Sequence, residues 1–147
     1  MTVRRQTFPG RLDQIEVICR VVDEGARDAG FDRSTSYACQ LAVSEACENI
    51  VKHGYGVEGG GKIDVAIWSE PGELTIELRD SAPPFNPARR PDQQKWTEKD
   101  PPVGGLGLLI IHRVMDEIEY HRRGGENRLR MRKRQNPTIA EPEQTQR

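Results

Sequence analysis

A glutamate and an asparagine lie one helical turn apart in the stretch SEACENIVKHGYG, residues 44–56. With about 100° of rotation per residue, the apolar residues around them form one broad arc of a helix. Glu45 lies at the edge of that arc, and Asn49 falls between the directions of Ala38 and Ala42. A carboxylate and an amide in such positions meet either water in a cleft or a ligand. The alternative is a pair of edge residues without a role, and the spacing leaves both interpretations open.

An aspartate ends the segment ELTIELRD, residues 73–80, whose apolar side chains alternate as in a half-buried strand. Because every second side chain points the same way, Asp80 extends the buried row that includes Ile76 and Leu78. A carboxylate at the end of such a row can accept a hydrogen bond from an amino group of a ligand. An inward-facing aspartate that only makes a turn is the other interpretation.

A short glycine-rich stretch precedes an apolar helical pattern. It comprises Gly104, Gly105, Leu106 and Gly107. Glycines let a backbone approach an oxyanion closely, and a helix N-terminus offers free N–H groups and a partial positive charge. The stretch is a candidate phosphate-binding turn, although an ordinary helix-entry loop is equally consistent with it. A second glycine pattern, residues 56–62, fits most of a Walker A loop, but Ile63 stands where a magnesium-binding serine or threonine is required.

The length and charge of the chain limit the functional classes. A chain of 147 residues predicts one domain with one core. The formal net charge of −1 gives no argument for direct binding of nucleic acid or of an anionic membrane. A run of about 18 apolar residues is absent, and the N-terminal residues lack the apolar core of a signal peptide. We therefore expect a cytoplasmic protein.

The cysteines and histidines do not indicate a metal centre or a disulfide framework. The cysteines are odd in number and form no C-x-x-C pair, which favours reduced, buried thiols. They are Cys19, Cys39 and Cys47. The histidines have no metal-ligand spacing. They are His53, His112 and His121. We expect no metal site that is built from side chains alone.

Two helices are predicted for the first third of the chain. Apolar residues at helical spacing predict a helix over residues 11–29, with Gly30 as its stop. A second helix should begin at Asp32 or Ser34, either of which can cap it, and should run to about Lys52. This second helix must position the carboxylate and the amide.

The remaining elements are two hairpins and a third helix. The strands of the first hairpin are expected at residues 62–68 and 73–80, and those of the second at residues 117–123 and 127–134. The third helix is expected from Gly107 onward. Residues 81–103, rich in proline and without periodicity, predict a long ordered loop or lid, and residues 135–147 a disordered tail. Three helices over one mixed, mostly antiparallel sheet make a two-layer α+β sandwich, a single domain over residues 1–134.

In this order the motifs resemble the GHKL superfamily, the histidine-kinase-like ATPases with a Bergerat-type ATP-binding fold. The motifs are Glu45-x-x-x-Asn49 on a helix, Asp80 at a strand end and Gly105-x-Gly107 at a helix start. The stretches LAVSEACENIVKHGYG, LRDSAPPFNP and GGLGLLIIHRVMDEIEY more narrowly resemble the anti-sigma factor serine kinases. The resemblance covers roughly residues 5–134.

This resemblance implies ATP and Mg²⁺ as ligands and a role for each candidate residue. Asn49 would bind the Mg²⁺ that bridges the phosphates, and Asp80 would accept a hydrogen bond from the adenine amino group. Glu45 would be the catalytic base that takes the proton of the attacking serine. Residues 85–103 would form a lid over the nucleotide. The implied ATP contacts also include His53, Ala82, Gly104, Gly105, Leu106 and Gly107.

The implied function is that of an anti-sigma factor and protein-serine kinase. The protein would bind a sigma factor and phosphorylate a serine of a STAS-type antagonist of the anti-sigma factor. It would act as a homodimer, for which the N-terminal strand and the first helix are the expected interface. Two departures favour an alternative, a nucleotide-binding partner-switch module with little or no kinase activity. Ala82 stands where the family commonly has glycine, and residues 101–103 offer no arginine before the glycine-rich turn.

Overall fold

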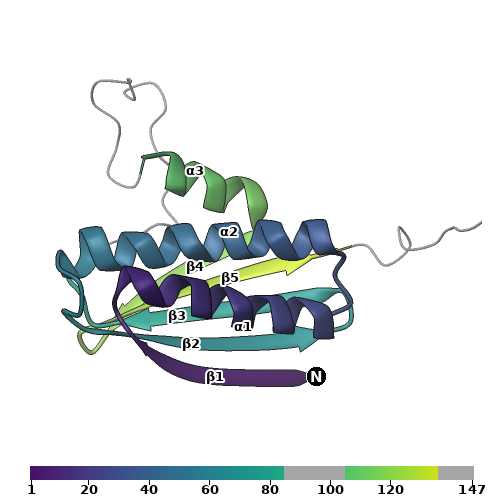
Figure 1. Ribbon diagram of the computed structural model, residues 1–147, viewed down its shortest axis with the longest axis horizontal. Helices are drawn as coiled ribbons and strands as arrows, with labels where there is room; N and C mark the ends of the chain where they lie inside the picture. Colours follow the sequence, from purple (N-terminus) through teal and green to yellow (C-terminus); the bar gives the residue numbers. More distant parts are fainter. Residues whose placement is uncertain (85–104, 136–147) are drawn as a thin grey trace, which may run out of the picture.

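The computed structural model describes residues 1–84 and 105–135, and it places three helices on one face of a five-stranded sheet (Figure 1). The strands are β1 Thr2–Pro9, β2 Lys62–Glu70, β3 Glu73–Asp80, β4 Glu117–Arg123 and β5 Glu126–Arg134. The helices are α1 Ile15–Asp28, α2 Arg33–Asn49 and α3 Gly105–Val114. The two-layer α+β architecture is therefore confirmed. The predicted lid and the predicted tail lie, except for their first residues, outside the described residues.

The sheet runs in the order β1-β2-β3-β5-β4, and every pairing among the described strands is antiparallel. The sequence prediction of a mixed sheet was too broad, because tight turns join β2 to β3 and β4 to β5, and β5 returns beside β3. The register of β3 and β5 places Leu78 opposite Leu129 and Asp80 opposite Asn127. The last residue of β3 thus has a polar neighbour on the adjacent strand.

The three helices cover the sheet side by side, with α2 between α1 and α3 (Figure 1). The predicted first helix is confirmed, but residues Leu12–Gln14 form a 3₁₀ turn and the α-helix proper begins at Ile15. It stops at Gly30, which has a φ of 81° and allows the N–H of Phe31 to reach the carbonyl of Ala26 at 3.0 Å.

Of the two expected caps of α2, the structure uses Asp32. Its Oδ1 accepts a hydrogen bond from the backbone N–H of Thr35 at 2.7 Å, and its Oδ2 accepts one from Gln135 Nε2 at 2.7 Å. Gln135 is the residue that follows β5, so the end of the last strand is attached to the start of α2.

No described helix is long and apolar enough to cross a membrane.

The end of α2 differs from the prediction. The α-helix ends at Asn49 and continues as a π-helical turn, Ile50–Tyr55, which Gly56 closes with a φ of 79°. Tyr55 holds this turn in place, because its hydroxyl donates to the carbonyl of Lys62 at 2.6 Å and accepts from the N–H of Ser81 at 3.0 Å. Single π-helical turns are frequent at functional sites. Here the turn directly follows Asn49.

The core lies between the helices and the helix-facing side of the sheet. Its largest fully buried side chains include Ile18, Ile67, Ile76 and Ile111. Cys39 and Cys47 are buried within it, and burial raises the pKa of the Cys39 thiol to about 12. Cys19 is partly buried and none of the three forms a disulfide. Thiols of this kind are unreactive packing groups.

Candidate functional site

Asn49 is buried on α2, and Glu45 is on the side of α2 that contacts the first turn of α3. The carboxylate of Glu45 is only partly exposed and lies against the first turn of α3, since a Cβ atom added to Gly107 would be 2.6 Å from Glu45 Oε1. Burial raises the pKa of Glu45, the nearby Glu48 raises it further, and Lys52 opposes the shift. The structure therefore brings together the predicted base and the predicted glycine turn.

Gly107 should be energetically coupled to Glu45. In the Glu45→Ala background, Gly107→Ala should stabilise the protein by about 0.5–1 kcal/mol, the helix-propensity difference between the two residues. In the wild type the same change should stabilise less or destabilise, because the carboxylate must move away from α3. Urea unfolding of the four variants measures this coupling, which we expect to be about 0.5 kcal/mol or more. Strictly additive effects would contradict the contact.

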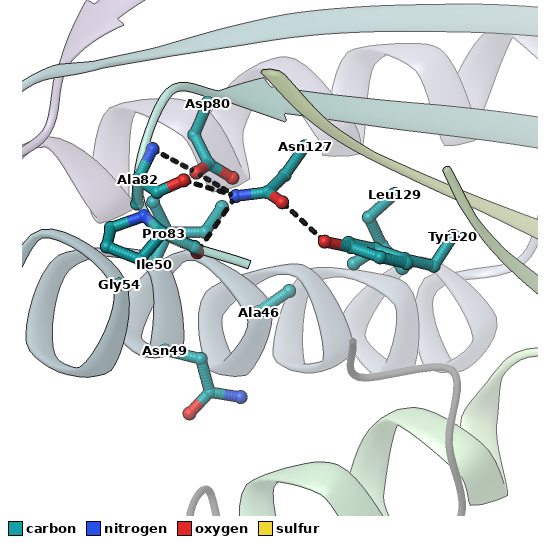
Figure 2. A pocket seen from close by; sticks show the side chains of 10 residues that line it. All are labelled: Ala46, Asn49, Ile50, Gly54, Asp80, Ala82, Pro83, Tyr120, Asn127 and Leu129. Atoms are coloured by element: carbon teal, nitrogen blue, oxygen red, sulfur yellow. Dashed lines mark hydrogen bonds between the residues drawn. The ribbon is translucent and has the colours of Figure 1, made fainter. Parts of the chain in front are cut away.

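Asn49 carries the orphaned polar group of the site. Asn49 is 6% exposed, and its Nδ2 is the buried side-chain nitrogen that has no hydrogen-bond partner among the described residues. In Figure 2 the amide points away from the cluster around Asp80. An unsatisfied buried donor costs about 1–3 kcal/mol, so proteins rarely keep one without a purpose. A ligand or a bound water can pair with such a group.

Asp80 lies where the alternation of β3 predicts it, inward and 7% exposed. Its Oδ1 accepts hydrogen bonds from the N–H of Ala82 and from Nδ2 of Asn127, both at 2.9 Å (Figure 2). Burial raises the pKa of Asp80, and these two hydrogen bonds and the charge of Arg122 partly offset that effect. The carboxylate is therefore held firmly in one orientation.

Three polar residues of the β4–β5 hairpin belong to the site and were missed by the sequence interpretation. Asn127, 5% exposed, receives hydrogen bonds at its Oδ1 from the hydroxyl of Tyr120 and, at 2.9 Å, from Nη1 of Arg122. The signal was available in NRLRMRKR, where Asn127 extends the inward row of Leu129 and Met131 as Asp80 extends its own row. It went unused because nothing local indicates that β5 pairs with β3.

A small, partly open pocket lies between the α2 side and the ends of β3 and β5 (Figure 2). Its lining includes Asn49 and Gly54 from the α2 side, Asp80 and Ala82 from the end of β3, and Asn127 and Leu129 from β5. Apolar walls with a few convergent polar groups are typical of small-molecule sites. The pocket thus has a hydrogen-bond acceptor for an amino group in Asp80, and Asn49 borders it from α2 with its amide turned away from Asp80.

The other residues predicted to contact ATP are not part of the described lining of this pocket. His53 is exposed on the π-helical turn and does not line this pocket. Gly105 and Leu106 form the start of α3, which begins two residues earlier than predicted. Gly107 is buried against Glu45. Gly104 lies outside the described residues.

A carboxylate–amide pair on one helix, an aspartate acceptor at a strand end and a helix that begins with glycines, all on an antiparallel sheet, together define an ATP-binding domain of the histidine-kinase-like type. The sequence comparison agrees with this class. The chain belongs to the family described as "Histidine kinase-like ATPase domain", which it matches over residues 8–133.

Two relatives illustrate the similarity. One is a protein named serine-protein kinase RsbW from Bacillus mycoides, 28% identical over 76% of this chain and 72% of that protein. The other has the same name, comes from Bacillus velezensis and is 25% identical over 80% of this chain and 77% of its own. These relatives confirm the resemblance to this kinase family.

Solved structures confirm the fold. The RsbU and RsbW domains of a Mycobacterium tuberculosis protein match with a TM-score of 0.63 and 18% identity, over 91% of this chain and 32% of that one. The catalytic domain of the histidine kinase ThkA matches with a TM-score of 0.50 and 14% identity, over 91% of this chain and 97% of that one.

Proposed function

We propose that the protein is an anti-sigma factor and an ATP-dependent protein-serine kinase. It binds a sigma factor and phosphorylates a serine of a STAS-type antagonist, so that phosphorylation decides which partner it holds. One observation carries the proposal: a buried, unpaired amide, Asn49, lies one turn from a carboxylate, Glu45, that contacts the first turn of α3. The names of the relatives support serine as the acceptor.

The residues present fit a magnesium–nucleotide complex. Asn49 offers an amide oxygen to the metal and an N–H donor to a phosphate oxygen or a metal-bound water. The described residues contain no cluster of histidine, cysteine or carboxylate groups that could hold a metal alone. This suits Mg²⁺, which takes few protein ligands and completes its shell with phosphates and water. When bound, Mg²⁺ neutralises charge on the phosphates.

The other proposed roles in binding and catalysis belong to side chains and backbone groups of this chain. Asp80 accepts a hydrogen bond from the adenine amino group and orients the base. The N–H groups of the first turn of α3 would hold the phosphates, aided by the positive end of the helix dipole. Glu45 would take the proton from the serine hydroxyl as the serine oxygen bonds to the terminal phosphorus, while the bond between that phosphorus and ADP breaks and ADP leaves. The raised pKa of Glu45 brings it closer to the range of an effective base. The contact of Glu45 with the first turn of α3 supports this role.

The alternative is a nucleotide-binding switch module with little transfer activity. The missing arginine in residues 101–103 still favours it. Ala82 favours it less, because Gly54 leaves room for the methyl group of Ala82: a Cβ atom added to Gly54 would be 3.0 Å from Ala82 Cβ. The family commonly has a glycine at the position of Ala82. Here a glycine lies on the opposite side of the same contact, at Gly54.

The pairing of Gly54 with Ala82 makes a prediction. Gly54→Ala should weaken ATP binding about tenfold or more, because two methyl groups would crowd the pocket wall at a cost of about 1–3 kcal/mol. The double variant Gly54→Ala/Ala82→Gly should regain most of the affinity, because only one methyl group remains. Fluorescence titration with an ATP analogue measures both. Failure of the second change to rescue the first would rule out the complementary fit.

The test of the proposed function is a direct transfer assay. Purified STAS-type antagonists of the source organism are incubated with the protein, γ-labelled ATP and Mg²⁺, and the label is mapped by mass spectrometry. Label on an antagonist serine is the expected result. ATP binding without any serine labelling would favour the switch module. Gel filtration of the same samples tests the proposed homodimer.

A further inference from the structure

The side-chain amide of Asn127 connects the β4–β5 hairpin to the end of β3, and both its oxygen and its nitrogen form hydrogen bonds. Asn127 lies opposite Asp80 in the strand register, and its Nδ2 donates to Asp80 Oδ1 and to the carbonyl of Ala82, both at 2.9 Å. Its Oδ1 accepts from the hydroxyl of Tyr120 and from Nη1 of Arg122. These contacts fix the orientation of the amide, because exchanging its oxygen and nitrogen would set donors against donors.

We infer that this hairpin positions the adenine-accepting carboxylate: Asn127, supported by Tyr120 and Arg122, holds Oδ1 of Asp80 and leaves Oδ2 to the ligand. The inference rests on the proposed ATP-binding function. The hydrogen bonds that the described residues make to Asp80 come from Ala82 and Asn127, and both end on Oδ1. Asn127 is a positioning residue, because it acts on the ligand through Asp80.

The same hairpin also clamps the turn that follows Asp80. Arg122 Nη1 donates to the carbonyl of Ala82 at 2.8 Å, and Asn127 Nδ2 reaches the carbonyl of Pro83 at 3.2 Å. On the opposite side, the hydroxyl of Tyr55 accepts from the N–H of Ser81 at 3.0 Å. A turn held from two sides is preorganised, which lowers the entropic cost of binding.

The titratable and charged groups that face Asp80 come from each element packed around it. They are Cys47 from α2, Tyr55 from the π-helical turn, Arg122 from β4 and Glu126 from β5. Cys47 and Tyr55 are neutral near pH 7, because burial raises the pKa of both. Among the described residues, the charges that act on Asp80 near pH 7 are therefore those of Arg122 and Glu126.

Two substitutions near Asp80 should shift its pKa in opposite directions. Burial raises the pKa of Asp80, the N–H of Asn127 lowers it, and the charge of Glu126 raises it. Asn127→Leu should therefore move the pKa of Asp80 further up, and Glu126→Gln should move it down. Because the ionised carboxylate is the better acceptor, ATP binding should weaken as the pH falls through the pKa of Asp80. That loss should begin at a higher pH in Asn127→Leu.

The experiment is a carboxyl titration by ¹³C NMR of the aspartate-labelled full chain without nucleotide, with calorimetry of Mg·ATP on the same samples. We expect the Asp80 resonance to titrate at higher pH in Asn127→Leu and at lower pH in Glu126→Gln. We expect Asn127→Leu to lose at least about tenfold in ATP affinity at neutral pH, as for a lost hydrogen bond to a charged group. Arg123→Leu, an exposed residue of the same hairpin, is the matched control and should change neither quantity.

Tyr120→Phe removes only the hydroxyl that supports Asn127, so it tests the inference even if Asn127→Leu fails to fold. It should shift the Asp80 titration in the same direction by a smaller amount. A wild type that binds no ATP would overturn the proposed function. A wild type that binds ATP, beside Asn127 and Tyr120 variants with unchanged affinity and unchanged Asp80 titration, would overturn this inference alone.

Discussion

Glu45→Gln should lower the rate of serine phosphorylation by a factor of about 100 or more and leave the affinity for Mg·ATP nearly unchanged. A positioned general base typically contributes about 10²–10⁴ to a rate, and glutamine keeps the size and hydrogen bonding of the side chain but cannot accept the proton. Single-turnover transfer and calorimetry measure the two quantities separately. The glutamine also keeps its place at Gly107, so the fold should be preserved.

The control for this substitution is Glu48→Gln on the same helix. Glu48 lies 3.6 Å from Lys52 Nζ in a half-exposed ion pair, and such pairs contribute little to stability. Its loss should leave binding within about twofold of the wild type and should change transfer far less than Glu45→Gln does, because Glu48 acts on transfer only through its effect on the pKa of Glu45. Equal, small effects of the two substitutions would contradict the role of Glu45 as the base and would favour the switch module.

Asn49→Leu should make the nucleotide-free protein more stable and insensitive to Mg·ATP. Leucine has nearly the same shape as asparagine but no unpaired N–H, so the free energy of unfolding should rise by about 1 kcal/mol. The wild type should gain stability with added Mg·ATP by mass action, whereas the variant should gain almost none. Thermal melting with and without Mg·ATP measures both effects.

The comparison variant is Asn49→Asp, which keeps an oxygen for Mg²⁺ and removes the N–H donor. It should retain part of the magnesium-dependent stabilisation that Asn49→Leu loses. If Asn49→Leu is less stable than the wild type and still gains stability with Mg·ATP, the amide is an ordinary packing group. A gain of stability at the cost of binding is the usual signature of a residue kept for function.

The alternation of side chains along a strand was enough to predict Asp80, because inward direction is a local property with a period of two. The helical arc was likewise enough to predict that Glu45 and Asn49 avoid the solvent-exposed side. Gly107 was predicted for closeness to a phosphate, and the structure adds a contact with Glu45 that only the packing of α3 on α2 could reveal. In each case the local sequence pattern was enough to predict the position of the residue, whereas its contacts depend on tertiary packing.

The features that the sequence did not reveal depend on long-range pairing. Asn127 became part of the site because β5 returns beside β3 and places it opposite Asp80, 47 residues away. The π-helical turn after Asn49 depends on Tyr55, whose hydroxyl bonds to Lys62 and Ser81 on two other elements. The fit of Ala82 against Gly54 depends on the same turn. Helix periodicity contains no information about such contacts.

The most direct test of the nucleotide pocket is calorimetric titration of ATP with Mg²⁺ into the wild type and Asp80→Asn. In the variant, Ala82 and Asn127 would still donate to the amide oxygen, and the new NH₂ group would face the adenine amino group, donor against donor. We predict saturable one-site binding to the wild type and its loss in the folded variant. Equal binding by both proteins, or no binding by the wild type at millimolar ATP, would contradict the assignment of this pocket to ATP.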